Sequence, residues 1–143
     1  MKLISYKQNG NIKFGALEDG KIYDLNAIDS QIADNMLEFL QGGKEQLQLA
    51  GAVIRNESPT MPVKDVELIS PVPNPSSVRD AYAFRQHVAT ARSNRGLNMV
   101  PEFDEIPIFY FSNHHAIFGP GSFPVRKRHT EKLDFELECA AVI

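Results

Sequence analysis

Residues 2–25 read KLISYKQNGNIKFGALEDGKIYDL, in which short apolar runs are separated by the dipeptides Asn9-Gly10 and Asp19-Gly20. Asparagine, aspartate and glycine tolerate the positive φ angles of the tight turns that join antiparallel strands. The pattern therefore predicts a three-stranded meander, and it indicates that the N-terminal part of the chain is rich in β-structure.

The next stretch has a helical period. Apolar residues between positions 32 and 40 recur at spacings of three and four, which places their side chains on one face of a helix. We expect Asp29 or Ser30 to cap this helix and Gly42-Gly43 to end it.

A second helix is predicted over residues 44–55, because Leu47, Ala50 and Ile54 share one face. Residues 58–62 contain two prolines and end this pattern. We therefore expect a small β-rich N-terminal domain over residues 1–65 and a second domain over residues 66–143.

The second domain mixes strands with one helical segment. Residues 66–69 and 106–111 are short apolar runs that predict strands, and residues 76–93 are compatible with a helix. Phe118-Gly119-Pro120-Gly121 indicates a turn. Together the two domains predict an α+β fold rich in β-structure.

Composition excludes several classes of protein. The net charge of −3 over 143 residues argues against nucleic acid as a partner, because such surfaces carry a basic excess. No stretch approaches the roughly 18 apolar residues of a membrane span, and a single cysteine permits no internal disulfide. The expected location is the cytoplasm.

Acidic and apolar residues alternate over residues 133–140, which read LDFELECA. In a strand, Asp134, Glu136 and Glu138 would line one face, where neighbouring carboxylates repel unless a cation lies between them. Mg²⁺ and Ca²⁺ prefer carboxylate oxygens. The alternative is a half-buried strand with a solvated acidic face and Cys139 as a core thiol on the other face.

A second group of functional side chains lies within residues 79–90, which read RDAYAFRQHVAT. If this segment is helical, Asp80, Phe84 and His87 share a face, since offsets of four and seven match the helical period. Asp80 could then join the carboxylates, and His87 could exchange a proton with water. The alternative is a capped helix with a partly buried histidine.

Other candidate sites are weaker. His114-His115 could suggest zinc, but adjacent side chains diverge on a strand and no third nitrogen ligand has a useful spacing. Gly119-Pro120-Gly121 lacks the strand-to-helix context and the following Lys-Ser/Thr of a phosphate loop.

Taken together, residues 79–90 and 133–140 resemble the fumarylacetoacetate hydrolase family. The first segment is similar to that family's Asp-x-Tyr…Arg-Gln-His-Ala-Thr stretch, and the second to its Leu-Asp-x-Glu-x-Glu-x-Ala strand. The resemblance covers residues 66–143, and it implies that these residues begin a mixed β-fold catalytic domain that is incomplete here.

The resemblance also implies roles for seven residues. Three would bind the divalent cation, Mg²⁺ or Ca²⁺: Asp80, Glu136 and Glu138. His87 would be the general base that activates the attacking water. Three would contact the substrate: Tyr82, Arg95 and Tyr110.

The implied activity is hydrolytic cleavage of a C–C bond in a 1,3-diketo acid, as in the catabolism of aromatic amino acids. A homodimer is implied as well, and the 143-residue chain is expected to be inactive alone because part of the metal shell would lie further along. Two alternatives stay open: isomerisation or decarboxylation of 2-hydroxy-dienoate diacids, and a non-catalytic β-rich interaction domain.

Overall fold

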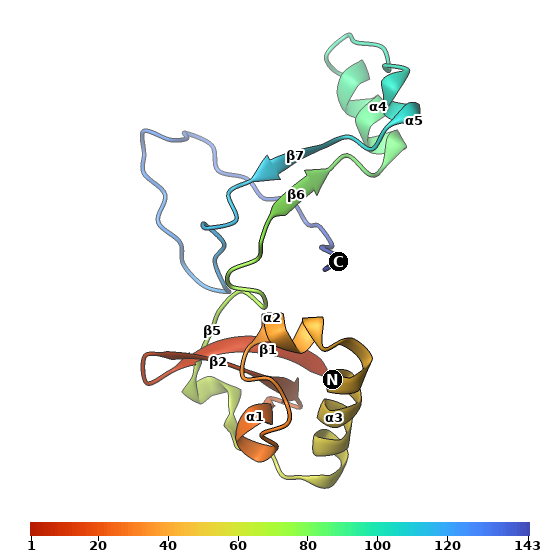
Figure 1. Cartoon of the computed structure of the whole chain (residues 1–143). Helices are drawn as coiled ribbons and strands as arrows, with labels where there is room; N and C mark the ends of the chain where they lie inside the picture. The colour runs from red at the N-terminus through yellow and green to blue at the C-terminus, as the bar shows by residue number, and fades with distance from the viewer.

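The computed structural model describes all 143 residues and has an α+β fold. Figure 1 shows a compact N-terminal part, with a sheet and three helices, from which a two-stranded ribbon leads to two short helices. The predicted α+β class is therefore confirmed at this level, whereas the specific fold of the resembled family stays a prediction.

The meander is formed as predicted. Strands β1 (Lys2–Gln8), β2 (Asn11–Glu18) and β3 (Lys21–Tyr23) pair in antiparallel order. Both turns have positive φ, with 51° at Asn9 and 82° at Gly10 in the first of them. Glycine, asparagine and aspartate adopt positive φ at a lower steric cost than other residues do.

Two short strands complete this sheet. β4 (Met61–Pro62) pairs with β3, and β5 (Glu67–Leu68) pairs with β1, which gives the order β4-β3-β2-β1-β5. The 3₁₀ helix η1 (Val63–Asp65) joins these two edge strands. The sheet therefore uses main chain up to Leu68.

Three helices share a core with the sheet: α1 (Leu25–Ile28), α2 (Met36–Gln41) and α3 (Gly43–Asn56). Capping explains two of their starts, since the Asp24 side chain accepts from Ala27 N and the Asn35 side chain accepts from Glu38 N. The core side chains come from the sheet, all three helices and the loop between α1 and α2: Phe14, Ala16, Leu25, Ile32, Met36, Phe39, Ala50 and Val53.

Two details of the predicted helices were wrong. The first helix begins at Met36 and not near Ile32, because Asn35 supplies the cap that we assigned to Asp29 or Ser30. On the second helix, Val53 is buried, whereas Leu47 is 46% exposed. The buried face of α3 thus contains Ala50 and Val53 but not Leu47.

The second part of the chain begins with a strand where a helix was predicted. β6 (Val78–Ala81) pairs with β7 (Phe109–Ser112), and the helix α4 (Arg85–Ser93) begins only after Phe84. The helical prediction for residues 76–93 was therefore wrong over its first half. The cause is non-local, because the ladder to β7 overrides the local preference.

A helical excursion separates the two ribbon strands. It holds α4 and α5 (Glu102–Glu105), which are joined by a bidentate ion pair between Arg85 and Asp104 at 2.8 and 3.1 Å. Figure 1 places both helices at the far end of the ribbon. None of the helices has the length and apolar character that a membrane crossing requires.

Residues 113–143 contain no helix or strand. The strand considered for residues 133–140 does not form, and none of the backbone groups of this segment joins a main-chain hydrogen bond. Cys139, which we interpreted as a core thiol, is exposed for the same reason.

Candidate functional site

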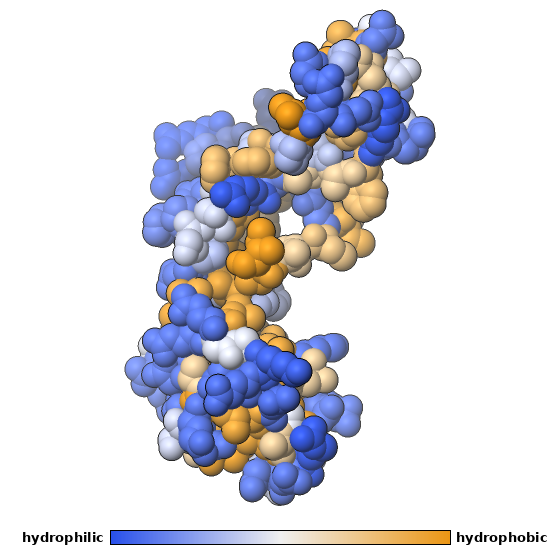
Figure 2. Space-filling model, turned by 45° about the vertical axis from the view of Figure 1, so that its right-hand side comes forward, coloured by the Kyte–Doolittle hydropathy of each residue, from blue (hydrophilic) through white to orange (hydrophobic).

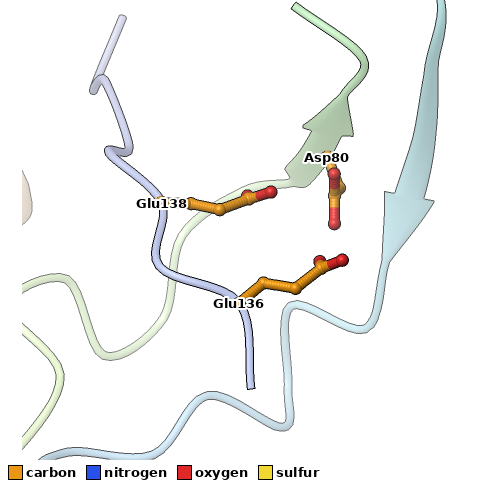
Figure 3. A group of neighbouring side chains, drawn as sticks. All are labelled: Asp80, Glu136 and Glu138. Atoms are coloured by element: carbon orange, nitrogen blue, oxygen red, sulfur yellow. The ribbon is translucent and has the colours of Figure 1, made fainter. Parts of the chain in front are cut away.

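Three carboxylates from two distant parts of the chain converge on one point. Asp80, Glu136 and Glu138 each place a carboxylate oxygen within 4.8 Å of the others. Figure 3 shows the two glutamates extending from the C-terminal segment toward Asp80 on the ribbon. The structure thus brings together the three residues that the family resemblance implied as metal ligands.

Local backbone geometry explains this convergence. Asp80 is fixed within β6, while Glu136 and Glu138 are two residues apart in the irregular C-terminal segment, and both side chains point toward Asp80 (Figure 3). The apolar residues next to them in the sequence are not buried, with Phe135 at 83% and Leu137 at 94% exposure. The alternative of a half-buried strand is therefore wrong for this segment.

Asp134 does not belong to the cluster. Its side chain accepts a hydrogen bond from the amide of Phe135 at 2.9 Å, and it is absent from the group of convergent carboxylates. The alternating pattern grouped Asp134 with Glu136 and Glu138, whereas the tertiary structure separates it from them, as the family resemblance implied.

Tyr110 is the direct neighbour of the cluster. It lies opposite Asp80 in the β6–β7 pair, and its phenol donates a hydrogen bond to Oδ2 of Asp80. This hydrogen bond, together with desolvation and the negative charges of Asp80, Glu136 and Glu138, raises the pKa of Tyr110 to about 12. The phenol therefore keeps its proton near neutral pH and acts as a donor.

A hollow of about 110 Å³ adjoins the carboxylates. Its walls include Tyr82, Phe84 and His87, together with the carboxylates and Tyr110. This volume suits an ion with a few water molecules, since pockets that enclose small-molecule ligands occupy roughly 300–1,000 Å³.

His87 reaches this hollow by a different route from the one we predicted. Asp80 lies on a strand and His87 in the first turn of α4, so the two do not share a helical face. β6 ends at Ala81, and Phe84, with φ −103° and ψ 102°, is the extended residue that precedes α4. His87 is exposed and not partly buried, so the interpretation as a core histidine is also wrong.

The predicted substrate contacts divide into two groups. Tyr82 and Tyr110 line the hollow, whereas Arg95 lies in the turn after α4 and is not among the lining residues. Phe84 also lines the hollow and was not predicted. The available signal was its position between Asp80 and His87 in the sequence.

The opposite face of the ribbon has a different character. The Arg79 guanidinium lies over the rings of Phe109 and Phe111, at 5.3 and 5.2 Å from their centroids. Alternation along the two strands therefore separates a cationic and aromatic face from the face that carries Asp80 and Tyr110.

The donor set of the cluster fits a hard divalent cation. All three groups are carboxylates, none of them joins any of the ion pairs with lysine or arginine in the structure, and oxygen is the ligand atom that Mg²⁺ and Ca²⁺ prefer. His114 and His115 lie with ring centroids 4.1 Å apart but join no such group. The residues present therefore favour Mg²⁺ or Ca²⁺ over zinc.

Comparison with known proteins agrees with the resemblance. Residues 76–143 match the family profile described as "Fumarylacetoacetate (FAA) hydrolase C-terminal". Over 124 residues the chain is 26% identical to "Oxaloacetate tautomerase FAHD2A, mitochondrial" of Bos taurus and 27% identical to the Homo sapiens protein of that name. Both alignments cover 87% of this chain and 37% of the relative.

A third relative shows similar identity over a longer alignment. "Oxaloacetate tautomerase fahd2, mitochondrial" of Xenopus laevis is 25% identical over 154 aligned positions, which cover 100% of this chain and 44% of that protein. The chain thus spans less than half the length of these curated relatives.

Proposed function

This chain belongs to the fumarylacetoacetate hydrolase family through residues 76–143, and on that basis we propose that it supplies a divalent-metal site to an enzyme acting on enolisable 2-keto acids. The observation that carries the proposal is the convergence of Asp80, Glu136 and Glu138, with oxygens within 4.8 Å of one another. Three carboxylates repel at this spacing, and a dication bound between them would offset the repulsion.

Asp80, Glu136 and Glu138 would hold the cation. When bound, a divalent cation polarises the keto oxygen of the substrate and stabilises negative charge on an enolate. Tyr110 donates a hydrogen bond within this site, and His87, at the wall of the same hollow, is placed to hold or move a proton. These residues form the part of the site that this chain contributes.

The reaction that we favour is interconversion of the enol and keto forms of a short 2-keto diacid such as oxaloacetate. It requires removal of a proton from the enol oxygen and addition of a proton to the carbon at the other end of the enol C=C bond. No bond that joins two heavy atoms is cleaved. One imidazole, that of His87, suits such a transfer, since imidazole exchanges protons near neutral pH. The relatives named oxaloacetate tautomerase support this choice.

The predicted C–C hydrolysis of a 1,3-diketo acid is the second candidate. It uses the same enolate stabilisation and adds attack by a water that His87 would deprotonate. One observation favours it: the rings of Tyr82 and Phe84 beside the hollow are 52% and 79% exposed and could cover an apolar acyl group. The isomerase or decarboxylase alternative, the role in aromatic catabolism, the homodimer and the cytoplasmic location stay predictions.

The metal site is tested by calorimetric titration of Mg²⁺ and Ca²⁺ into the protein and into Glu136→Gln. We expect the wild type to bind and the variant to lose binding. Asp134→Asn is the matched control, because it removes a nearby carboxylate that does not belong to the cluster. If the wild type binds neither ion, the three carboxylates are a solvated acidic surface, and the non-catalytic alternative is favoured.

The reaction is tested with the protein and Mg²⁺. Absorbance of the enol form follows tautomerisation of oxaloacetate, and chromatography of the products detects fragmentation of an acylpyruvate. We expect His87→Asn to lose the activity while metal binding persists. If the protein converts neither oxaloacetate nor an acylpyruvate under these conditions, the proposed function is overturned.

A further inference from the structure

The contact between Tyr110 and Asp80 is set by the register of the ribbon. The two residues are direct cross-strand partners, so their side chains project from the same face of the β6–β7 pair. Tyr110 is 57% exposed, and the strand pairing therefore fixes the position of the phenol more than packing around the ring does.

This contact engages one oxygen of the Asp80 carboxylate. The phenol donates to Oδ2, and no other side-chain hydrogen bond or ion pair of the structure involves Asp80. The second oxygen, Oδ1, therefore has no protein donor and remains available to a ligand. A carboxylate held in this way offers one oxygen to a cation more readily than two.

Mg²⁺ and Ca²⁺ differ in how they use carboxylates. Mg²⁺ requires near-ideal octahedral geometry and keeps several waters, whereas Ca²⁺ accepts six to eight oxygens in flexible geometry and often binds both oxygens of one carboxylate. We propose that Tyr110 is a positioning residue that holds Asp80 as a one-oxygen ligand and thereby favours Mg²⁺ over Ca²⁺ at this site. The inference rests on the metal site of the proposed function.

The test is a pair of calorimetric titrations, Mg²⁺ and Ca²⁺, on the wild-type chain and on Tyr110→Phe. Loss of the phenol should lower the affinity for Mg²⁺ by about tenfold, a typical effect of removing a partner of a metal ligand. The affinity for Ca²⁺ should stay the same or rise, because Oδ2 becomes free. Tyr82→Phe is the matched control, since it removes a phenol from the same hollow that makes no hydrogen bond to Asp80.

Each result has a distinct meaning. A fall in the ratio of Mg²⁺ to Ca²⁺ affinity in Tyr110→Phe, but not in Tyr82→Phe, supports the inference. Equal changes for the two ions, or no change, would overturn it and leave the metal site intact. Absence of binding by the wild type would overturn both the metal site and this inference. Circular dichroism of each variant verifies that the fold is retained.

Discussion

At the scale of single residues, the Lys13–Asp24 pair combines a buried carboxylate with a partly exposed ammonium. Nζ of Lys13 lies 2.6 Å from Oδ2 of Asp24, whose side chain is 8% exposed. Asp24 also caps α1 by accepting from Ala27 N. One side chain thus joins β2 to the start of the first helix.

We expect Lys13→Met to lower the free energy of unfolding by about 1–3 kcal/mol, because it leaves the Asp24 carboxylate buried without a counter-charge. Urea denaturation measures the change. Lys7→Met is the control, since the Lys7–Glu67 pair is exposed and its two charged atoms are 3.7 Å apart. An effect of Lys13→Met no larger than that of the control would show that the pair contributes only as a surface interaction.

A second prediction concerns the phenol of Tyr110, whose pKa is raised to about 12, with the hydrogen bond to Asp80 as the largest cause. Asp80→Asn removes the carboxylate charge, so the pKa of Tyr110 should fall toward its ordinary value of about 10. The ¹³Cζ resonance of Tyr110, followed against pH, measures the shift. A pKa that stays near 12 in Asp80→Asn would assign the shift to desolvation instead.

The sign of the associated pH dependence follows from the direction of this shift. The folded chain holds the Tyr110 proton more firmly than the unfolded chain does, so the contribution to stability is complete below about pH 10. It is lost as the pH rises through about 12, the value in the folded chain. Burial raises the pKa of Tyr6 as well, so both parts of the chain should lose stability in alkali.

At the scale of elements, the close approach of residues 113–122 to β5 connects the two parts of the chain. A Cβ on Gly119 would lie 2.5 Å from Cα of Ile69 and 2.7 Å from the carbonyl oxygen of Leu68. Both neighbours are main-chain atoms of the N-terminal part, which cannot rotate aside as a flexible side chain would. Gly119 is therefore required at this contact by space and not by its φ angle.

We expect Gly119→Ala to separate this loop from β5 and to cost about 1–3 kcal/mol, as overpacking commonly does. The amide of Ile69, which donates to the Ser5 carbonyl at 3.1 Å, should then exchange faster with deuterium. Ser122→Ala, in the same loop and exposed, serves as the control. Unchanged exchange at Ile69 would mean that the loop shifts without disturbing β5.

Elements defined by local chemistry were the ones that the sequence could predict. The two turns at Asn9-Gly10 and Asp19-Gly20 require only residues that accept positive φ, and the meander forms as expected. The helix predicted at residues 78–81 does not form, because this segment pairs with β7. That strand lies about thirty residues further along the chain, and the pairing overrides the local helical pattern. Sequence periodicity carries no information about such pairing.

The candidate site shows the same limit. Family resemblance named Asp80, Glu136 and Glu138, and the structure brings them together; their functional roles stay predictions. Spacing alone added Asp134 to the group and placed Asp80 and His87 on one helix, and both inferences were wrong. Both errors come from assuming one regular element in each segment, because residues 133–140 form no strand and residues 79–90 change from the strand β6 to the helix α4.

At the scale of the whole molecule, burial is distributed unequally. The structure has 15 buried residues, and all except Val88 lie within residues 1–70. Figure 2 shows apolar side chains on the surface in the middle of the molecule, above the compact N-terminal part. The exposed apolar residues of the second part favour association with another chain or segment, which agrees with the predicted homodimer without testing it.

This distribution predicts that the N-terminal part folds by itself. A chain of residues 1–75 keeps the five-stranded sheet, the three helices and the hydrogen bond from Ser5 Oγ to the Pro71 carbonyl. It also retains 14 of the 15 buried residues, so it should unfold cooperatively at nearly the temperature of the corresponding transition in the 143-residue chain. Differential scanning calorimetry of both chains measures this.

Residues 76–143 should behave differently on their own, because a two-stranded ribbon is marginal in water and Val88 is their one buried residue. We expect them to show no cooperative transition and to bind a dye that detects exposed apolar surface. If instead the 1–75 chain were unfolded, the contact of Gly119 with Ile69 would have to stabilise the sheet far more than its few atoms suggest. In that case Gly119→Ala should unfold the whole molecule, so the two experiments together determine which part of the chain stabilises the other.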